Sequence, residues 1–159
     1  MTFIEGYHVG IVVADLEASC EEFSDLLGVR FAEQQHRDLP VTAADGPVQA
    51  RFRFTYSLPT SGPALIELIE GPEGSPWWPG EGVAAALHHV GFWDDELPVS
   101  SERLEAAGAP REAAVLDDEG RARGFAYHQL RHGPRIELVD AARRPSFQAW
   151  LAGGTFPQG

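Results

Sequence analysis

The chain has 159 residues, of which 12 are basic and 24 acidic, giving a formal net charge of −12. This length suits one compact domain, and a composition that is 43% hydrophobic and 23% charged excludes a disordered or fibrous chain. All the basic residues are arginine, which excludes lysine chemistry, and the acidic balance argues against binding to nucleic acid or to an anionic membrane surface.

The first half of the chain begins with a predicted strand over residues 7–13, which opens on the triplet His8-Val9-Gly10. Apolar residues at helical spacing predict a helix after it, with Asp15 as the N-cap and Gly28 as the C-terminal stop. Two strands are expected further along, at 50–58 and at 65–70, with residues 39–47 as a loop. In the last of these strands, Glu67 interrupts a run of Leu and Ile.

The second half repeats this order. The triplet returns as His89-Val90-Gly91 in a predicted strand over residues 88–93, and Ser100 is the expected cap of a short helix closed by Gly108. Glu137 lies in an apolar strand, as Glu67 does. Within the second half, a loop is expected at 116–123 and a strand at 124–132. We therefore expect one domain over 1–159. It consists of a module at 5–70, a Gly- and Pro-rich linker at 71–85, a second module at 86–140 and a C-terminal tail at 141–159.

Two histidines and two glutamates occupy equivalent places in the two modules. Each histidine shares a strand face with the glycine two residues later, which clears space beside the imidazole. A carboxylate inside an apolar strand needs a cation, a hydrogen-bond network or a metal as its partner. Imidazole nitrogens and carboxylate oxygens suit a divalent first-row metal such as Zn, Ni, Co, Mn or Fe. We therefore predict a metal site formed by His8, Glu67, His89 and Glu137.

The ligand set has competitors. His88 neighbours His89, but the repeat matches His88 with Tyr7 and so favours His89. Arg135 lies two residues from Glu137 on the same strand face and is an alternative partner for that carboxylate. The remaining histidines have no equivalent in the other module and are expected at the surface; they are His36, His128 and His132.

On these motifs, the chain resembles the vicinal oxygen chelate (VOC) superfamily, which includes glyoxalase I, methylmalonyl-CoA epimerase, extradiol dioxygenases and the bleomycin and fosfomycin resistance proteins. The segments that carry the resemblance are 8–16, 26–28, 66–68, 87–92 and 135–139. The resemblance implies a single VOC domain of the α+β class, in which two paired βαβββ modules form an incomplete β-barrel around a metal site.

The motifs favour two branches of this superfamily. The segment 87–92, which reads Leu-His-His-Val-Gly-Phe, and the linker ending in Gly-Glu-Gly look most like the epimerases. The ligand order His, Glu, His, Glu is more like bacterial glyoxalase I, because epimerases typically carry Gln where this chain has Glu67. Both branches imply a metal-dependent isomerase, epimerase or lyase that removes a proton alpha to a carbonyl group, with Glu137 as the expected base and Glu67 as the alternative.

Two other functions are open to a chain of this kind. An iron-dependent extradiol-type dioxygenase would need only His8, His89 and Glu137, and Glu67 would then block the position that dioxygen takes. A bleomycin-resistance-like protein that binds a cationic drug or metabolite would suit the net charge, but such binders generally lack the ligand residues found here.

Further expectations concern the surroundings of the site and the partners of the protein. Weaker candidates for lining a substrate cavity are Trp77, Trp93, Tyr127 and Gln129. The expected partner is a small molecule with a carbonyl group or vicinal oxygens, and the superfamily resemblance implies a homodimer. Cys20 as the single cysteine and an N-terminus without the pattern of a secretory signal predict a cytoplasmic protein.

Overall fold

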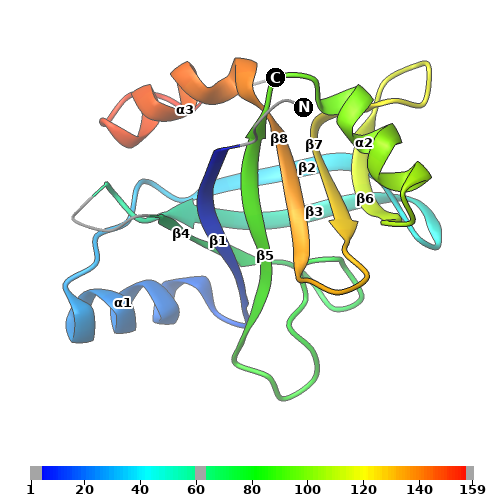
Figure 1. The fold of residues 1–159 in the computed structure, drawn as a ribbon. Coiled ribbons are helices and arrows are strands. Elements are labelled where there is room, and N and C mark those ends of the chain that lie inside the picture. Colours follow the sequence, from blue (N-terminus) through cyan, green and yellow to red (C-terminus); the bar gives the residue numbers. More distant parts are fainter. Residues whose placement is uncertain (1–4, 60–63, 157–159) are drawn as a thin grey trace.

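A computed structural model describes residues 5–59 and 64–156 of the chain. Its first module contains β1 (Glu5–Val13), α1 (Leu16–Leu27), β2 (Gln35–Ala43), β3 (Gly46–Tyr56) and β4 (Leu65–Glu70). The second contains β5 (Ala85–Asp94), α2 (Leu97–Ala106), β6 (Arg111–Leu116), β7 (Ala122–Gln129) and β8 (Arg135–Asp140), followed by the short helix η1 (Ala141–Arg143) and by α3 (Arg144–Leu151) (Figure 1). The α+β fold of two βαβββ units is confirmed.

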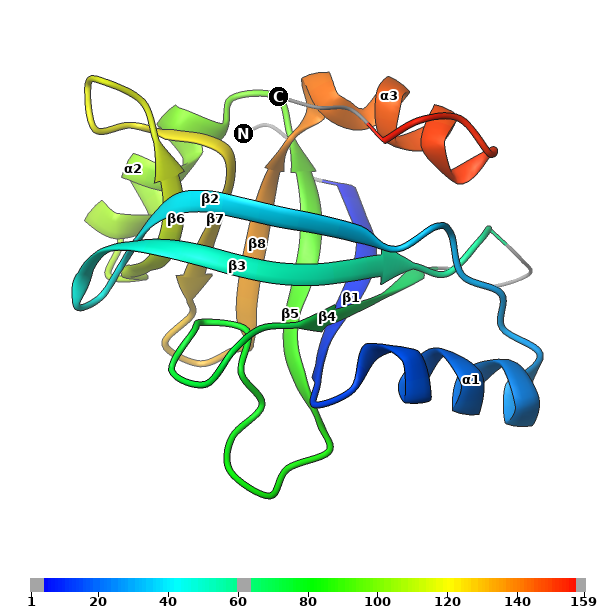
Figure 2. The same cartoon turned by 180° about the vertical axis from the view of Figure 1, so that it is seen from behind.

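The strands form one ring in the order β1-β4-β3-β2-β6-β7-β8-β5. The two modules meet along a long antiparallel pairing of β1 with β5, and β2 and β3 cross the other side of the barrel (Figure 2). A second join closes the ring where β2 pairs with β6 through only two residue pairs, Thr42 with Ala114 and Ala43 with Ala113. The expected incomplete barrel is thus closed within this chain, at a narrow join.

Two local predictions from sequence are wrong. Residues 39–47 are mostly strand, because the β2–β3 hairpin pairs continuously up to Ala43 and Gly46, although Pro40 and the polar composition of β2 conceal it in the sequence. Helix α2 begins at Leu97, with Pro98 in the first turn, where a missing N–H costs little, so Ser100 lies inside the helix and does not cap it.

A third correction concerns His128, which is fully buried and not at the surface. Its Nδ1 lies 3.1 Å from the Ala109 carbonyl oxygen and its Nε2 lies 2.9 Å from Ser101 Oγ, so the imidazole joins β7 to α2. His36 and His132 are exposed, as expected.

The ends of the barrel differ. Helix α3 lies at one end, and the linker between β4 and β5 lies at the other (Figures 1 and 2). The linker contributes Trp77, which is 1% exposed and donates a hydrogen bond from Nε1 to Tyr127 Oη at 3.1 Å. Its indole packs within the main hydrophobic core of the barrel and therefore anchors the linker there. None of the described helices is long and apolar enough to cross a membrane.

Candidate metal centre

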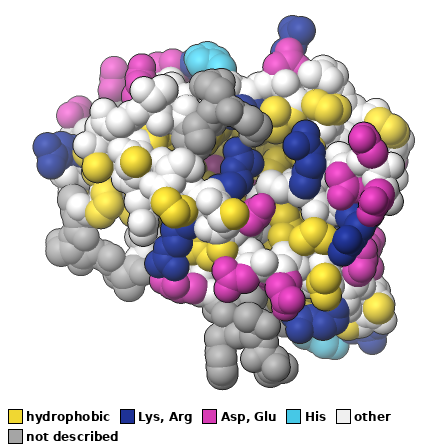
Figure 3. All heavy atoms as spheres, turned by 90° about the horizontal axis from the view of Figure 1, so that it is seen from above, with side chains coloured by type: hydrophobic (Ala, Val, Ile, Leu, Met, Phe, Trp, Pro, Cys, Tyr) yellow, Lys and Arg dark blue, Asp and Glu magenta, His cyan; other side chains and the backbone are white. Residues whose placement is uncertain are grey.

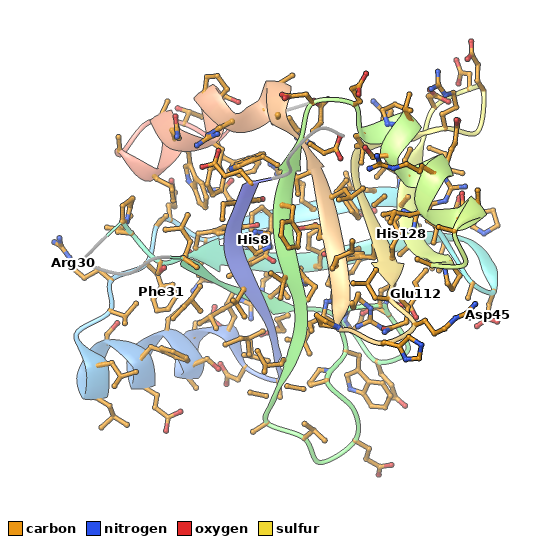
Figure 4. All side chains as sticks on the ribbon, viewed as in Figure 1. His8, Arg30, Phe31, Asp45, Glu112 and His128 are labelled. Atoms are coloured by element: carbon orange, nitrogen blue, oxygen red, sulfur yellow. The ribbon has the colours of Figure 1, made fainter. Side chains whose placement is uncertain are left out.

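The four predicted ligands lie together inside the barrel. His8 comes from β1, Glu67 from β4, His89 from β5 and Glu137 from β8, and none is more than 6% exposed. One ligand atom of each lies within 4.8 Å of the others, so the group could hold a metal ion. A single chain supplies all four, and Figure 4 shows His8 among the central strands.

The separations of the donor atoms fit a shared ion. The two imidazole Nε2 atoms are 2.7 Å apart, and the Oε2 atoms of Glu67 and Glu137 lie between 3.1 and 3.5 Å from them. Ligands bonded to one ion at about 2.0–2.2 Å are about 3 Å apart at a right angle and about 3.4 Å apart in a tetrahedron. Both Oε2 atoms are buried without a hydrogen-bond partner, so they are directed at the centre of the group and not at a donor.

The competing partner for Glu137 is engaged elsewhere. Arg135 Nε donates to Glu112 Oε2 at 2.5 Å, and this ion pair is about one-third exposed. Each ligand carboxylate instead has a tyrosine as its cross-strand neighbour, Tyr56 beside Glu67 and Tyr127 beside Glu137. Burial, reinforced by the two carboxylates, raises the pKa of both phenols, which keeps them as neutral hydroxyl groups.

Two β-bulges place additional side chains beside the ligands. In the β1–β5 pairing, Tyr7 is the extra residue between Gly6 and His8, and His88 is the extra residue between Leu87 and His89. The repeat had matched His88 with Tyr7, and the bulges occupy these same positions. The Tyr7 ring lies 4.3 Å from the His8 ring between centroids, and stacks on Trp93 at 4.0 Å.

The glycines of the two triplets make room for the imidazoles, but across the module boundary. A Cβ on Gly91 would lie 1.8 Å from His8 Cε1, and a Cβ on Gly10 would lie 2.0 Å from His89 Cε1. The expectation that each glycine serves the histidine of its own strand is therefore wrong. The antiparallel register explains the exchange, since it pairs His8 with Gly91 and Gly10 with His89.

A hydrogen-bond chain orients His89. His88 Nε2 lies 2.8 Å from the Pro76 carbonyl oxygen, and His88 Nδ1 lies 2.8 Å from His89 Nδ1. Because a carbonyl only accepts, His88 Nε2 donates, and the neutral ring then accepts at Nδ1 from His89 Nδ1–H. Burial, with repulsion from His89, lowers the pKa of His88 to about 4, which keeps that ring neutral. The lone pair of His89 Nε2 is consequently left for a metal.

Replacing His88 with Ala is expected to weaken metal affinity by about 10–100-fold, the usual effect of losing the hydrogen-bond partner of a metal-binding histidine. His88→Gln, which can accept through its amide oxygen, should lose less. Chelator competition measures both affinities. His132→Ala, at an exposed histidine, is the control, and equal affinity of His88→Ala and the parent protein would contradict this orienting role.

Metal affinity should also depend on pH. Burial alone would lower the pKa of His89, but Glu137 and Glu67 outweigh it and raise that pKa to about 9 in the metal-free protein. Below that pH a metal must displace a proton from His89, and the two carboxylates also raise the pKa of His8 against the effect of burial, so the apparent affinity should rise at least about tenfold per pH unit from pH 6 and level off near pH 9. Calorimetric titration in buffers of different ionisation enthalpy would count the released proton. An affinity that is constant over this range would contradict the prediction.

The carboxylates of Glu67 and Glu137 line a cavity of about 360 Å³. Trp77, Trp93 and Tyr127 line it, as the sequence had suggested. Gln129 does not, because it is the last residue of β7 and its Nε2 donates to the carbonyl oxygens of Leu130 and Gly133 in the following turn. Further lining residues were not predicted from the sequence, among them Tyr7, Arg37, Tyr56, Arg123, Arg143 and Phe147.

Comparison with solved structures gives related folds. Methylmalonyl-CoA epimerase from Mycobacterium tuberculosis aligns with a TM-score of 0.63 and 21% identity over 89% of this chain and 91% of that one. A Streptomyces coelicolor methylmalonyl-CoA epimerase variant in complex with 2-nitronate-propionyl-CoA aligns with a TM-score of 0.57 and 18% identity, over 89% of this chain and 96% of that one. A mutant of 4-hydroxymandelate synthase from Streptomyces coelicolor aligns with a TM-score of 0.54 and 19% identity, over 89% of this chain and 39% of the enzyme.

At the level of sequence, no curated protein matches significantly. A family model described as the Glyoxalase/Bleomycin resistance protein/Dioxygenase superfamily matches residues 7–127, which include three of the four clustered ligands. The fourth, Glu137, lies beyond the matched range, on a strand that completes the same ring. With the two modules, the ring order and the paired His–Glu sets in place, the chain belongs to the glyoxalase, bleomycin resistance protein and dioxygenase superfamily.

Proposed function

We propose that the protein is a divalent-metal-dependent isomerase, epimerase or lyase that moves a proton alpha to the carbonyl group of a small molecule. The observation that carries this proposal is the pair of buried Oε2 atoms, from Glu67 and Glu137, which lack hydrogen-bond partners beside two imidazoles at the wall of a cavity. A bound Zn, Ni, Co, Mn or Fe ion would supply Lewis acidity there, which stabilises negative charge on a substrate oxygen.

The residues around the cavity divide the remaining tasks. Glu137 is the proposed base, and Glu67 is the alternative, since both carboxylates line the cavity. His8 and His89 would hold the ion with them. The neutral hydroxyl groups of Tyr56 and Tyr127, the cross-strand neighbours of Glu67 and Glu137, are the proposed hydrogen-bond donors to these carboxylates. Trp77 and the other aromatic side chains exclude water from the reacting carbon.

Solvent deuterium exchange tests the proposal. The protein would be loaded with each candidate metal in turn and incubated in D₂O with a panel of α-carbonyl compounds, including methylmalonyl-CoA and compact hydroxyketones. Mass spectrometry should detect deuterium at the α-carbon only with the metal-loaded protein. Consumption of dioxygen without exchange would indicate a dioxygenase. No stoichiometric metal after metal-replete expression, with unchanged ligand binding in Glu137→Gln, would reject the enzyme and favour a binding protein.

A further inference from the structure

The cavity has two chemically different ends. Glu67, Glu137 and Trp77 are almost fully buried, while three arginines that line the same cavity, Arg37, Arg123 and Arg143, reach solvent in part. Figure 3 shows the α3 end of the barrel, where dark-blue Arg side chains lie beside hydrophobic side chains around a recess. A ligand entering here would pass positive charge before reaching the carboxylates.

These three arginines come from distant segments. Arg37 is on β2, Arg123 on β7 and Arg143 on η1. The Arg37 guanidinium lies over the Phe156 ring, 4.3 Å from its centroid, and the Nη1 of Arg143 lies 3.0 Å from where a Cβ on Gly124 would be. Arg37 and Arg143 line the same cavity, and burial together with repulsion from Arg143 lowers the pKa of Arg37. The fold therefore brings three arginines, against the single carboxylate of Asp140, to the more exposed part of this cavity, in a chain of net charge −12.

The walls between the two ends are apolar, and the space is small. Apolar side chains make up most of the remaining lining, among them Leu39, Phe52, Phe54, Val115, Phe125 and Val139. A volume of about 360 Å³ is near the lower limit for ligand pockets, which span about 300–1,000 Å³. A compact ligand with an aromatic or branched apolar body fills such a space, whereas most of a coenzyme A thioester would lie outside it.

We propose that the substrate is a compact anion with three parts in line: an α-oxygenated carbonyl group toward His8, Glu67, His89 and Glu137, an apolar body between the aromatic walls, and a carboxylate or phosphate held by Arg37, Arg123 and Arg143. The direction of the carbonyl group depends on the proposed function. The anion contact does not, because guanidinium groups bind carboxylates and phosphates without a metal.

Compounds that differ mainly in their anionic group test the anion contact separately from the binding of the carbonyl group and the apolar body. The compound 4-(hydroxyacetyl)benzoate carries a hydroxyketone, an aromatic ring and a distal carboxylate, and its methyl ester lacks only the charge. The phosphate analogue, 4-(hydroxyacetyl)phenyl phosphate, identifies which anion is preferred. Tryptophan fluorescence titration of the full chain should show the better anion binding at least about tenfold more tightly than the ester, with metal and without it.

Substitutions then locate the contact. Arg123→Gln and Arg143→Gln should each reduce the preference for the anion over the ester by about tenfold and leave ester affinity nearly unchanged. Arg30→Gln is the control, at an exposed arginine that points away from the barrel (Figure 4). Equal affinity for anion and ester, an unchanged preference in both variants, or tighter binding of methylmalonyl-CoA through the same arginines would overturn the proposal. Loss of deuterium exchange with the preference intact would reject only the proposed function.

Discussion

Gly91→Ala is expected to reduce metal affinity by at least about 100-fold while the barrel still folds. The new Cβ would lie 1.8 Å from His8 Cε1, and His8 is 1% exposed and enclosed by Tyr7 and Tyr56, whose ring centroids lie 4.3 and 5.3 Å away. The imidazole must therefore leave its position, and overpacking of this kind costs about 1–3 kcal/mol of stability. Gly10→Ala should have the same effect through His89.

The control for this experiment is Gly6, which lies on β1 together with Gly10. Gly6→Ala would place a Cβ 3.4 Å from Phe92 Cε1, close to ordinary van der Waals contact, and should leave metal affinity intact. Metal content would be measured by elemental analysis and affinity by chelator competition, with circular dichroism to follow folding. Parent-like affinity in a folded Gly91→Ala protein would show that His8 Nε2 is not a ligand.

Glu137→Gln is expected to slow α-proton exchange by about 10²–10⁴-fold, the typical contribution of a general base. Exchange must be measured at saturating metal, because the substitution also removes a ligand oxygen. Glu67→Gln should weaken metal binding similarly and retain more of the exchange rate once the metal is saturating, if Glu137 is the base. The reverse order would assign the base to Glu67.

Glu112→Gln is the matched control for both glutamates. This carboxylate belongs to the second module and pairs with Arg135, but it is partly exposed and lies outside the cavity. Its loss should change neither metal affinity nor exchange. If Glu112→Gln reduced exchange as strongly as Glu137→Gln, the rate would be reporting general damage to the second module and not the chemistry of the buried pair.

The candidate metal centre could be predicted from the sequence because its four residues follow the repeat. His8 and His89, like Glu67 and Glu137, stand at equivalent points of two copies of one pattern, and local alternation is enough to predict their strand faces. The bulges at Tyr7 and His88 break that alternation, so a regular strand pattern could not place the side chains beside the ligands.

The lining of the cavity was harder to predict from the sequence, for a different reason. Arg37, Arg123 and Arg143 have no common motif, and only the closure of the ring and the position of η1 bring them together. Gln129, by contrast, was predicted to line the cavity and does not. Strand alternation put it on the same face as Tyr127, but its amide nitrogen donates to carbonyl oxygens of the turn after β7. Strand ends and long-range proximity depend on tertiary structure, which residue spacing does not encode.

The two joins of the ring are unequal. The four candidate ligands lie on β1, β4, β5 and β8, which contain or border the long β1–β5 join. Arg123 lies on β7, close to the join of β2 with β6, which has only two residue pairs, and Arg37 lies further along β2. Substitutions near that short join can therefore reshape the entrance without shifting the metal ligands. This division would allow substrate preference to change on one side of the barrel while the candidate metal centre on the other side stays in place.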